Sequence, residues 1–232
     1  MTPDPAADAF RAEGSALCAV TAELADAELG RPSPCPPWSN ADLLCHIAIA
    51  TGRIGQAIDA ARDAGGELVT AAGYYRPDER FSPAVNADRI DIASALAVRL
   101  GSAAAIHAGL TAAIDRSLAV LQSAPADQEV RTRHGDRMLL SQFTVTRVVE
   151  LAVHGLDAAA GLGRPPWLTS EAAGVLEDLL LPGTGAAKAD ELRARLGCDR
   201  AGFIARLTGR VPLSQAETAV LGETGITRLA LG

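Results

Sequence analysis

Four ionisable residues in the second half of the chain, Arg147, Glu150, His154 and Asp157, follow one another at intervals of three or four positions. On an α-helix, which turns about 100° per residue, they fall within roughly 80° of one another. The opposite side of this stretch is apolar, so a narrow polar seam would run along a mostly hydrophobic helix. A glutamate and a histidine four positions apart stand side by side on a helix, and both bind divalent metals.

A metal site needs more than two protein ligands, and His46 is the best third candidate among the four histidines. His46 lies in an apolar run over residues 43–50, which is typical of a buried helix. Two histidines and one glutamate would leave a tetrahedral metal one open position, as in catalytic zinc sites. The simpler alternative is a solvated ion pair between Glu150 and Arg147, with His46 as an ordinary core histidine.

Composition limits the classes of function. The chain has 232 residues, 48% of them hydrophobic, which is enough for one elaborated domain with a real core. A net charge of -7 without a basic run argues against nucleic acid or an anionic membrane as partner. We expect a cytoplasmic protein, because the N-terminus lacks signal-peptide features and no apolar run approaches the ~20 residues that span a membrane. The four cysteines show no CxxC pairing, which predicts reduced thiols.

The spacing of apolar residues predicts a mainly all-α fold with four principal helices. They are expected over about residues 5–29, from Ser39 onward, over 84–123, and from Ser141 to about 162. This pattern indicates an antiparallel four-helix bundle over residues 1–165, with ligands from facing helices meeting in its core.

A short β-hairpin is expected over residues 130–138, around Gly135. Residues 166–232 are predicted to form a short helical extension packed on the bundle. Its helices are expected at Ser170–Leu181, Ala189–Leu196, Arg200–Leu207 and Ser214–Leu221.

Between Asp63 and Pro83 the helical periodicity is lost, and long loops of this kind are often functional. The segment concentrates aromatic residues and arginines: Tyr74, Tyr75, Arg76, Arg80 and Phe81. We interpret it as a flap over the metal site whose arginines receive a carboxylate, with a surface loop held by anchoring aromatics as the equal alternative. Of the other two histidines, His107 is expected to be non-functional and His134 is a weak candidate for a fourth ligand.

Two motifs point to a family. The string P-P-W-S-N-A-D-L-L-C-H at residues 36–46, together with R-V-V-E-L-A-V-H-G-L-D-A-A at 147–159, resembles the N-terminal domain of mycothiol-dependent maleylpyruvate isomerases, within the DinB-like metal-binding bundles. The likeness extends over about residues 5–165, and the stretch 201–213 is similar to a short C-terminal segment of some members. The resemblance implies a divalent metal, commonly zinc, held by His46, Glu150 and His154.

The resemblance also implies that the metal binds and activates a small thiol, mycothiol, as a thiolate nucleophile. Attack on an electrophilic small molecule would then give either cis-trans isomerisation or S-conjugation. The C-terminal part is shorter than the substrate-binding domain expected of the isomerase, so we assign substrate contacts on chemistry alone to Arg76, Arg80 and Arg147. Tyr74 and Tyr75 are assigned to the thiol cofactor, and Asp157 is expected to orient a ligand or pair with Arg147.

Two alternatives from other classes stay open. One is a non-catalytic metal-binding or stress-response bundle whose apolar faces form a homodimer. The other is a metal-assisted hydrolase in which hydroxide attacks instead of thiolate. The identity of the metal is open as well, because two histidines and a carboxylate also accept iron or nickel.

Overall fold

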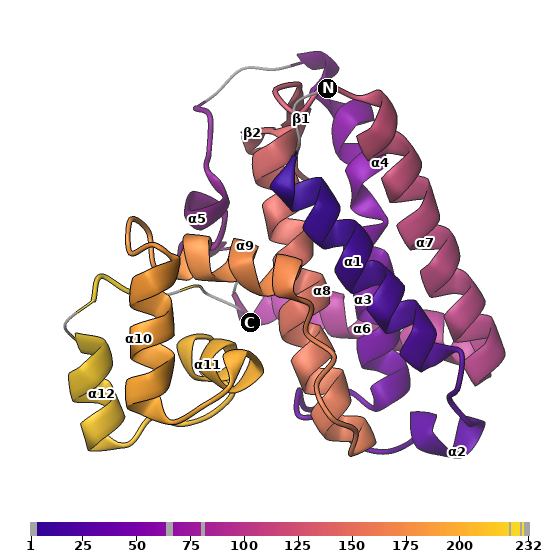
Figure 1. The fold of residues 1–232 in the computed structure, drawn as a ribbon. Helices are drawn as coiled ribbons and strands as arrows, with labels where there is room; N and C mark the ends of the chain where they lie inside the picture. Colours follow the sequence, from indigo (N-terminus) through magenta and orange to yellow (C-terminus); the bar gives the residue numbers. More distant parts are fainter. Residues whose placement is uncertain (1–3, 64–66, 80–81, 223, 228, 230–232) are drawn as a thin grey trace.

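The computed structural model describes residues 4–63, 67–79, 82–222, 224–227 and 229, and the chain is mainly α-helical (Figure 1). Four helices form a closed bundle in which each packs against two of the others. They are α1 (Pro5–Thr21), α3 (Asn40–Thr51), α7 (Ala103–Ser123) and α8 (Leu140–Leu162), with α4 (Arg53–Asp59) continuing α3. In Figure 1, α1 and α8 run in one direction and α3 and α7 in the other. The predicted DinB-like antiparallel four-helix bundle is confirmed.

The N-terminus of α3 lies where the sequence places it. Ser39 is the N-cap: its hydroxyl accepts a hydrogen bond from the Asp42 N–H, and the Asp42 carboxylate accepts one from the Ser39 N–H. This reciprocal capping box satisfies two backbone donors that the first turn leaves without helical partners. It also fixes which residues of α3 face the bundle, because the helical phase is set from its first residue.

Two of the predicted helices are divided in the structure. The expected helix over 5–29 ends at Thr21, and a short helix α2 (Asp26–Leu29) follows. The expected helix over 84–123 consists of α6 (Pro83–Leu100) and α7, because Gly101 adopts a left-handed conformation with φ 68°. Ser102 then caps α7, so a second helix starts in a new direction directly after Gly101. α6 packs mainly on the outside of α3.

The remaining short elements connect the bundle. A 3-10 turn (Ala60–Asp63) follows α4, and α5 (Ala71–Tyr74) lies in the segment expected to be irregular. The predicted hairpin is confirmed: β1 (Glu129–Arg131) pairs antiparallel with β2 (Arg137–Leu139). Gly135 in its turn has φ 86°, a value that favours glycine.

The C-terminal extension is helical, as predicted. It contains α9 (Ser170–Leu180), α10 (Ala186–Leu196), α11 (Arg200–Leu207) and α12 (Gln215–Gly222). α9 packs on α1 and α8, and α11 contacts both α9 and α8. A small separate core forms farther out, from Leu181, Ala189, Leu192, Phe203 and Leu221. The division of the chain into two units at residue 165 stays a prediction.

By its length and mean hydropathy, α7 meets the criteria for a membrane-spanning helix, contrary to the expectation that no stretch of the chain is long and apolar enough. One face of α7, with Ile106, Leu110 and Ile114, is buried, and the helix packs against α1 and α3. Core helices of helical bundles meet the same criteria. The cytoplasmic location stays a prediction.

Gly161, near the end of α8, allows the side chain of Asn40 to approach the helix. The buried Asn40 amide donates hydrogen bonds to the carbonyls of Glu28 and Gly161, at 3.1 and 3.2 Å, and thereby joins α2, α3 and α8. A Cβ atom on Gly161 would overlap the Oδ1 atom of Asn40.

We predict that Gly161→Ala lowers the free energy of unfolding by about 1–3 kcal/mol, because the Asn40 side chain must move. The intrinsic preference of a helix for alanine over glycine, ~1 kcal/mol, would otherwise make the substitution stabilising. Gly30→Ala is the matched control, since Gly30 has φ -77° and a Cβ there would meet no atom within 4 Å, and its effect should stay within about 0.5 kcal/mol. Urea unfolding measures both, and a Gly161→Ala protein as stable as the parent would contradict the prediction.

Candidate metal centre

His46 on α3 and the pair Glu150 and His154 on α8 meet where these two helices face each other. The Nε2 atom of His46 lies 3.3 Å from Oε2 of Glu150, and Nε2 of His154 lies 3.6 Å from the same oxygen. One donor atom from each residue lies within 4.8 Å of the other two. Two ligand atoms of a tetrahedral zinc ion stand about 3.4 Å apart, so the spacing suits a metal.

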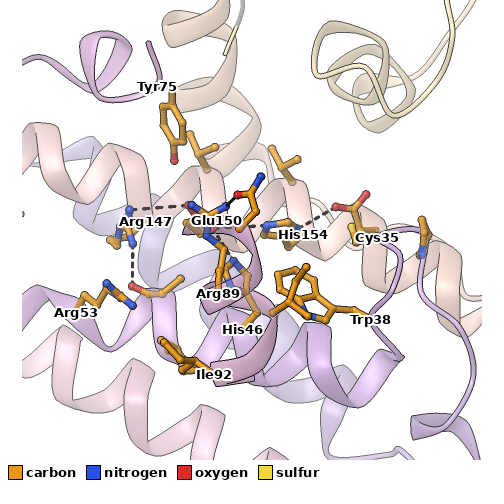
Figure 2. A pocket seen from close by; sticks show the side chains of 18 of the residues that line it. Cys35, Trp38, His46, Arg53, Tyr75, Arg89, Ile92, Arg147, Glu150 and His154 are labelled. Carbon is orange, nitrogen blue, oxygen red and sulfur yellow. Dashed lines mark hydrogen bonds and ion pairs between the residues drawn. The ribbon is translucent and has the colours of Figure 1, made fainter. Parts of the chain in front are cut away.

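Trp38 holds the two imidazoles in place. Its ring centroid lies 4.7 Å from that of His46 and 6.4 Å from that of His154, and the two histidine rings stand nearly perpendicular, at 88°. Trp38 directly precedes the N-cap of α3. Its backbone N–H donates a hydrogen bond to the Cys35 carbonyl, and its carbonyl accepts one from the Ser33 N–H. The same turn that starts α3 therefore sets the indole against the second-turn histidine (Figure 2).

The protonation states favour metal binding. Burial lowers the pKa of His46 to about 4, so its imidazole is neutral at pH 7 and has a lone pair to donate. Burial by itself raises the pKa of Glu150, but the hydrogen bond to His46 and the charge of Arg147 outweigh it and hold that pKa well below its usual range. Glu150 is therefore ionised, and His46 and Glu150 are in the form that a divalent cation requires.

His154 has a partner on its other nitrogen. Its Nδ1 atom lies 3.0 Å from Oδ2 of Asp157, which leaves Nε2 directed toward Glu150. Arg210 in turn donates to both oxygens of Asp157, from Nε at 3.2 Å and from Nη2 at 3.1 Å. A carboxylate behind a metal-binding histidine fixes its tautomer and ring orientation. The residues present thus fit a divalent metal, with Asp157 and Arg210 as support.

A second group of donor atoms shares His154. Cys35, His154 and Asp157 also have one donor atom each within 4.8 Å of the others. Burial, together with the charge of Asp157 and a hydrogen bond to it, raises the pKa of the Cys35 thiol to about 12, which disfavours the thiolate that would bind a metal. Both carboxylate oxygens of Asp157 also accept hydrogen bonds from Arg210. We therefore treat His46, Glu150 and His154 as the candidate ligands.

These three residues lie in the wall of a cavity of about 470 Å³. Other residues of its lining include Cys35, Trp38, Tyr74, Tyr75 and Asp157. A volume of this size holds a small-molecule ligand, and polar groups placed in a cavity wall are typical of a binding site. The cavity is therefore the place where a ligand would reach a metal held by the three residues.

The family is settled by comparison with known proteins. The family model of the mycothiol maleylpyruvate isomerase N-terminal domain matches residues 10–159. This chain belongs to that family. The matched stretch contains α3 and most of α8, including all three candidate ligands of this family member.

Solved structures agree with the fold. The crystal structure of the mycothiol-dependent maleylpyruvate isomerase is similar, with a TM-score of 0.51, 18% sequence identity, and coverage of 74% of this chain and 66% of that chain. A crystal structure of a histidine-to-alanine mutant of that enzyme is similar too, with a TM-score of 0.50, 17% identity and the same coverage. This family member thus spans just under two thirds of the length of that enzyme. Comparison of its sequence with curated proteins found no match.

Of the predicted substrate residues, Arg147 is at the cavity. Its side chain is buried, with 2% of the residue exposed, and Nη1 donates to the Ala50 carbonyl on α3 at 3.0 Å. Nη2 lies 3.9 Å from Oε1 of Glu150, and the guanidinium packs over the ring of Phe143 at 4.7 Å. Asp157 was predicted either to orient a ligand residue or to pair with Arg147, and in the structure it contacts the ligand residue His154.

Only part of the segment that was expected to cover the metal site lies in the described residues. Tyr74 and Tyr75 line the cavity, and the Tyr75 hydroxyl donates to the Thr146 carbonyl at 2.9 Å. Arg76 is not in the lining: it pairs with Asp78, and 54% of its side chain is exposed. Arg80 and Phe81 lie outside the described residues. The assignment of Tyr74 and Tyr75 to the thiol cofactor stays a prediction.

Sequence reasoning missed four arginines that line the cavity: Arg53, Arg89, Arg133 and Arg210. A signal existed for Arg53, because it follows His46 by seven residues, or two helical turns, and so lies on the same face. Arg210 lies in the 201–213 stretch that resembles other family members, but its contact with Asp157 spans two separate parts of the chain. Arg89 and Arg133 had no signal of this kind.

The other two histidines differ in position. His134 lines the cavity, but it belongs to neither group of donor atoms that is compact enough for a metal, among the residues the structure describes. His107 lies on α7 and belongs to neither of these groups of donor atoms. Its Nδ1 atom forms a hydrogen bond of 3.0 Å with the Thr21 hydroxyl of α1. This contact is consistent with a structural role.

The ion pair behind His154 predicts a pH-dependent contribution to stability. Burial raises the pKa of Asp157, but His154 and Arg210 outweigh it and lower that pKa from 3.8 to about 2. Because the folded-state pKa is the lower one, the stabilisation is complete above about pH 4 and is lost as the pH falls toward 2. Asp157→Asn should therefore cost about 2 kcal/mol of unfolding free energy at pH 7, and much less at pH 2.5.

Chemical unfolding of chelator-treated protein at both pH values checks this. The exposed Asp91 on α6 supplies the control, since Asp91→Asn should change stability by less than about 0.5 kcal/mol at either pH. A deficit for Asp157→Asn that is as large at pH 2.5 as at pH 7 would show that the carboxylate charge is not what stabilises the fold.

Proposed function

We propose that this protein is a metal-dependent enzyme that activates mycothiol for attack on an electrophilic small molecule, with cis-trans isomerisation as its reaction. The observation that carries the proposal is the meeting of His46, Glu150 and His154 in the wall of a ligand-sized cavity. Membership in the mycothiol maleylpyruvate isomerase N-terminal domain family supports the choice of thiol and of reaction.

We assign the metal as zinc, held by one nitrogen from each histidine and by the Glu150 carboxylate. A divalent cation bound there would lower the pKa of a coordinating thiol, so that the thiol is ionised at neutral pH. Glu150 and the neutral His46 supply ligand atoms without first losing a proton at pH 7. Asp157 accepts a hydrogen bond from the Nδ1–H of His154, and this tautomer leaves the Nε2 lone pair free for the metal.

Other residues of the cavity wall would shield the metal site and bind the substrate. Trp38 packs against both imidazoles and would limit the access of water to a thiol bound there. Arg147 supplies positive charge beside Glu150, where a carboxylate of the substrate would lie. In an isomerisation, the cis double bond of the substrate becomes a single bond when sulfur adds, rotates, and re-forms as trans when sulfur leaves. The thiol is regenerated and no group is transferred overall.

We further propose that the chain divides after residue 165 into the metal-binding bundle and the C-terminal extension. The extension reaches the site through Arg210, which contacts Asp157 behind His154. Its role would then be to orient a ligand residue rather than to form a large substrate-binding domain.

Metal content tests the ligand assignment. Purified wild-type protein should retain a stoichiometric divalent metal, and His46→Ala with His154→Ala should lose it, because two of three protein ligands are removed. His107→Ala removes a histidine away from the site and should retain the metal. Elemental analysis gives the content of each protein, and stoichiometric metal in the double variant would end the assignment.

Thiol dependence tests the reaction. We expect the conversion of maleylpyruvate to its trans isomer to require added mycothiol and to leave the mycothiol concentration unchanged, as NMR of the mixture would measure. Stoichiometric consumption of the thiol would indicate S-conjugation instead. Equal turnover without thiol would favour a hydrolase, and no turnover of any electrophile tested would favour a non-catalytic metal-binding bundle.

A further inference from the structure

The outer face of α6 is exposed and partly apolar. This helix packs mainly on α3, and its buried residues are Ala93 and Ala97. The exposed large hydrophobic side chains of the described residues include Ile92, with 50% of the residue exposed, and Val98, with 83%. Both belong to α6, so this helix presents apolar side chains to the outside of the bundle as well as to α3.

Four exposed residues of α6 form a stripe that we call the outer stripe: Asp88, Ile92, Ala95 and Arg99. They follow one another at intervals of four, three and four positions. At about 100° per residue they fall within about 60° of one another, and Val98 lies at the edge of this face. Alternating intervals of three and four are those of the seam along which two helices pack. The outer stripe therefore has the pattern of a helix–helix contact.

The outer stripe is complementary to itself when two copies run antiparallel. Its spacing is symmetric about a point midway between residues 93 and 94. Around that point, Asp88 would lie opposite Arg99 of the partner subunit. Ile92 would lie opposite Ala95 of the partner subunit, a large side chain against a small one. A two-fold axis makes each of these contacts twice, as in isologous dimers.

The charges favour this arrangement over a parallel one. The N-terminal half of the outer face carries Asp88 and Asp91, and the C-terminal half carries Arg99. Within the part of the chain that the structure describes, neither Asp88 nor Arg99 has a hydrogen bond or an ion pair. A parallel pair would bring like charges together at both ends of the stripe, which is unfavourable, whereas an antiparallel pair brings opposite charges together.

We infer that the outer stripe of α6 is the contact between two copies of this chain, which pair antiparallel about a two-fold axis. The stripe is about 16 Å long, and one helix face buries less than the ~800 Å² per partner of a typical stable interface. The dimer is therefore weak, with a dissociation constant on the order of 10–100 µM.

The dimer has a consequence for the cavity. Ile92 belongs to the outer stripe and also to the lining of the cavity that contains His46, Glu150 and His154, and it is half exposed. The partner subunit would therefore border the cavity at the position of Ile92. The inference goes beyond the proposed function, because the contact between the two copies requires neither a metal nor a thiol.

Sedimentation velocity of the full chain, after chelator treatment and without thiol, tests the inference. Over about 1–500 µM protein, the sedimentation coefficient should rise reversibly from that of a monomer toward that of a dimer. Ala95→Glu should weaken the dimer about tenfold or more, because it places a charge in the apolar middle of the stripe. A monomer at every concentration overturns the inference, and so does a dimer that Ala95→Glu leaves unchanged.

A charge exchange tests the antiparallel register. Asp88→Arg and Arg99→Asp should each raise the dissociation constant about tenfold or more, because each places like charges opposite one another twice in the dimer. The double variant re-forms both ion pairs and should restore the dissociation constant to within about threefold.

Asp115→Arg is the matched control for this charge change, since Asp115 is exposed on α7, and it should leave the dimer unchanged. Thermal melts of all variants check the fold. Single variants without effect, or a double variant no stronger than the single ones, overturn the antiparallel pairing. These outcomes are independent of metal retention and of thiol-dependent turnover, so failure here leaves the proposed function standing.

Discussion

The structure is organised around an ionised carboxylate, that of Glu150, inside a helical bundle. An ion moved from water into a protein interior loses several kcal/mol of hydration, which close partners must offset. His46 on α3 supplies a hydrogen bond across the helix interface, and Arg147 supplies charge from the preceding turn of α8. The His46–Glu150 contact and the hydrogen bond from Arg147 to the Ala50 carbonyl both join α3 to α8, and together they hold the two helices at one register. A metal ion held by Glu150 would be a further close partner of this carboxylate.

The C-terminal extension is connected to Glu150 through a series of polar contacts. Arg210 contacts Asp157, Asp157 contacts His154, and His154 faces Glu150. This chain of polar contacts connects α11 and the turn after it to the centre of the bundle, although the extension also has a small core of its own. The extension also contributes Leu176, Leu180 and Ile204 to the core of the bundle, so it supports both the packing of the main helices and the orientation of His154.

Much of the local structure was predictable, and the failures have physical causes. The capping box at Ser39, the hairpin around Gly135 and the end of α8 at Gly163 all rest on short-range backbone chemistry that the sequence displays. The single helix predicted over 84–123 was wrong because periodicity alone cannot distinguish a glycine tolerated within a helix from Gly101, which ends α6 in a left-handed conformation. The helix predicted to residue 29 failed similarly, since apolar spacing persisted after α1 ended at Thr21.

The sequence by itself determined the helical phases, and with them which side chains share a face: Glu150 with His154, and His46 on the buried side of α3. These relations depend on a fixed rotation per residue, so counting positions is enough. Only the tertiary structure decided that α3 meets α8 at the height of these residues, that Arg210 supports Asp157, and that Arg53, Arg89 and Arg133 rather than Arg76 line the cavity. Such contacts join segments up to about a hundred residues apart, and helix packing sets them, which local sequence patterns do not encode.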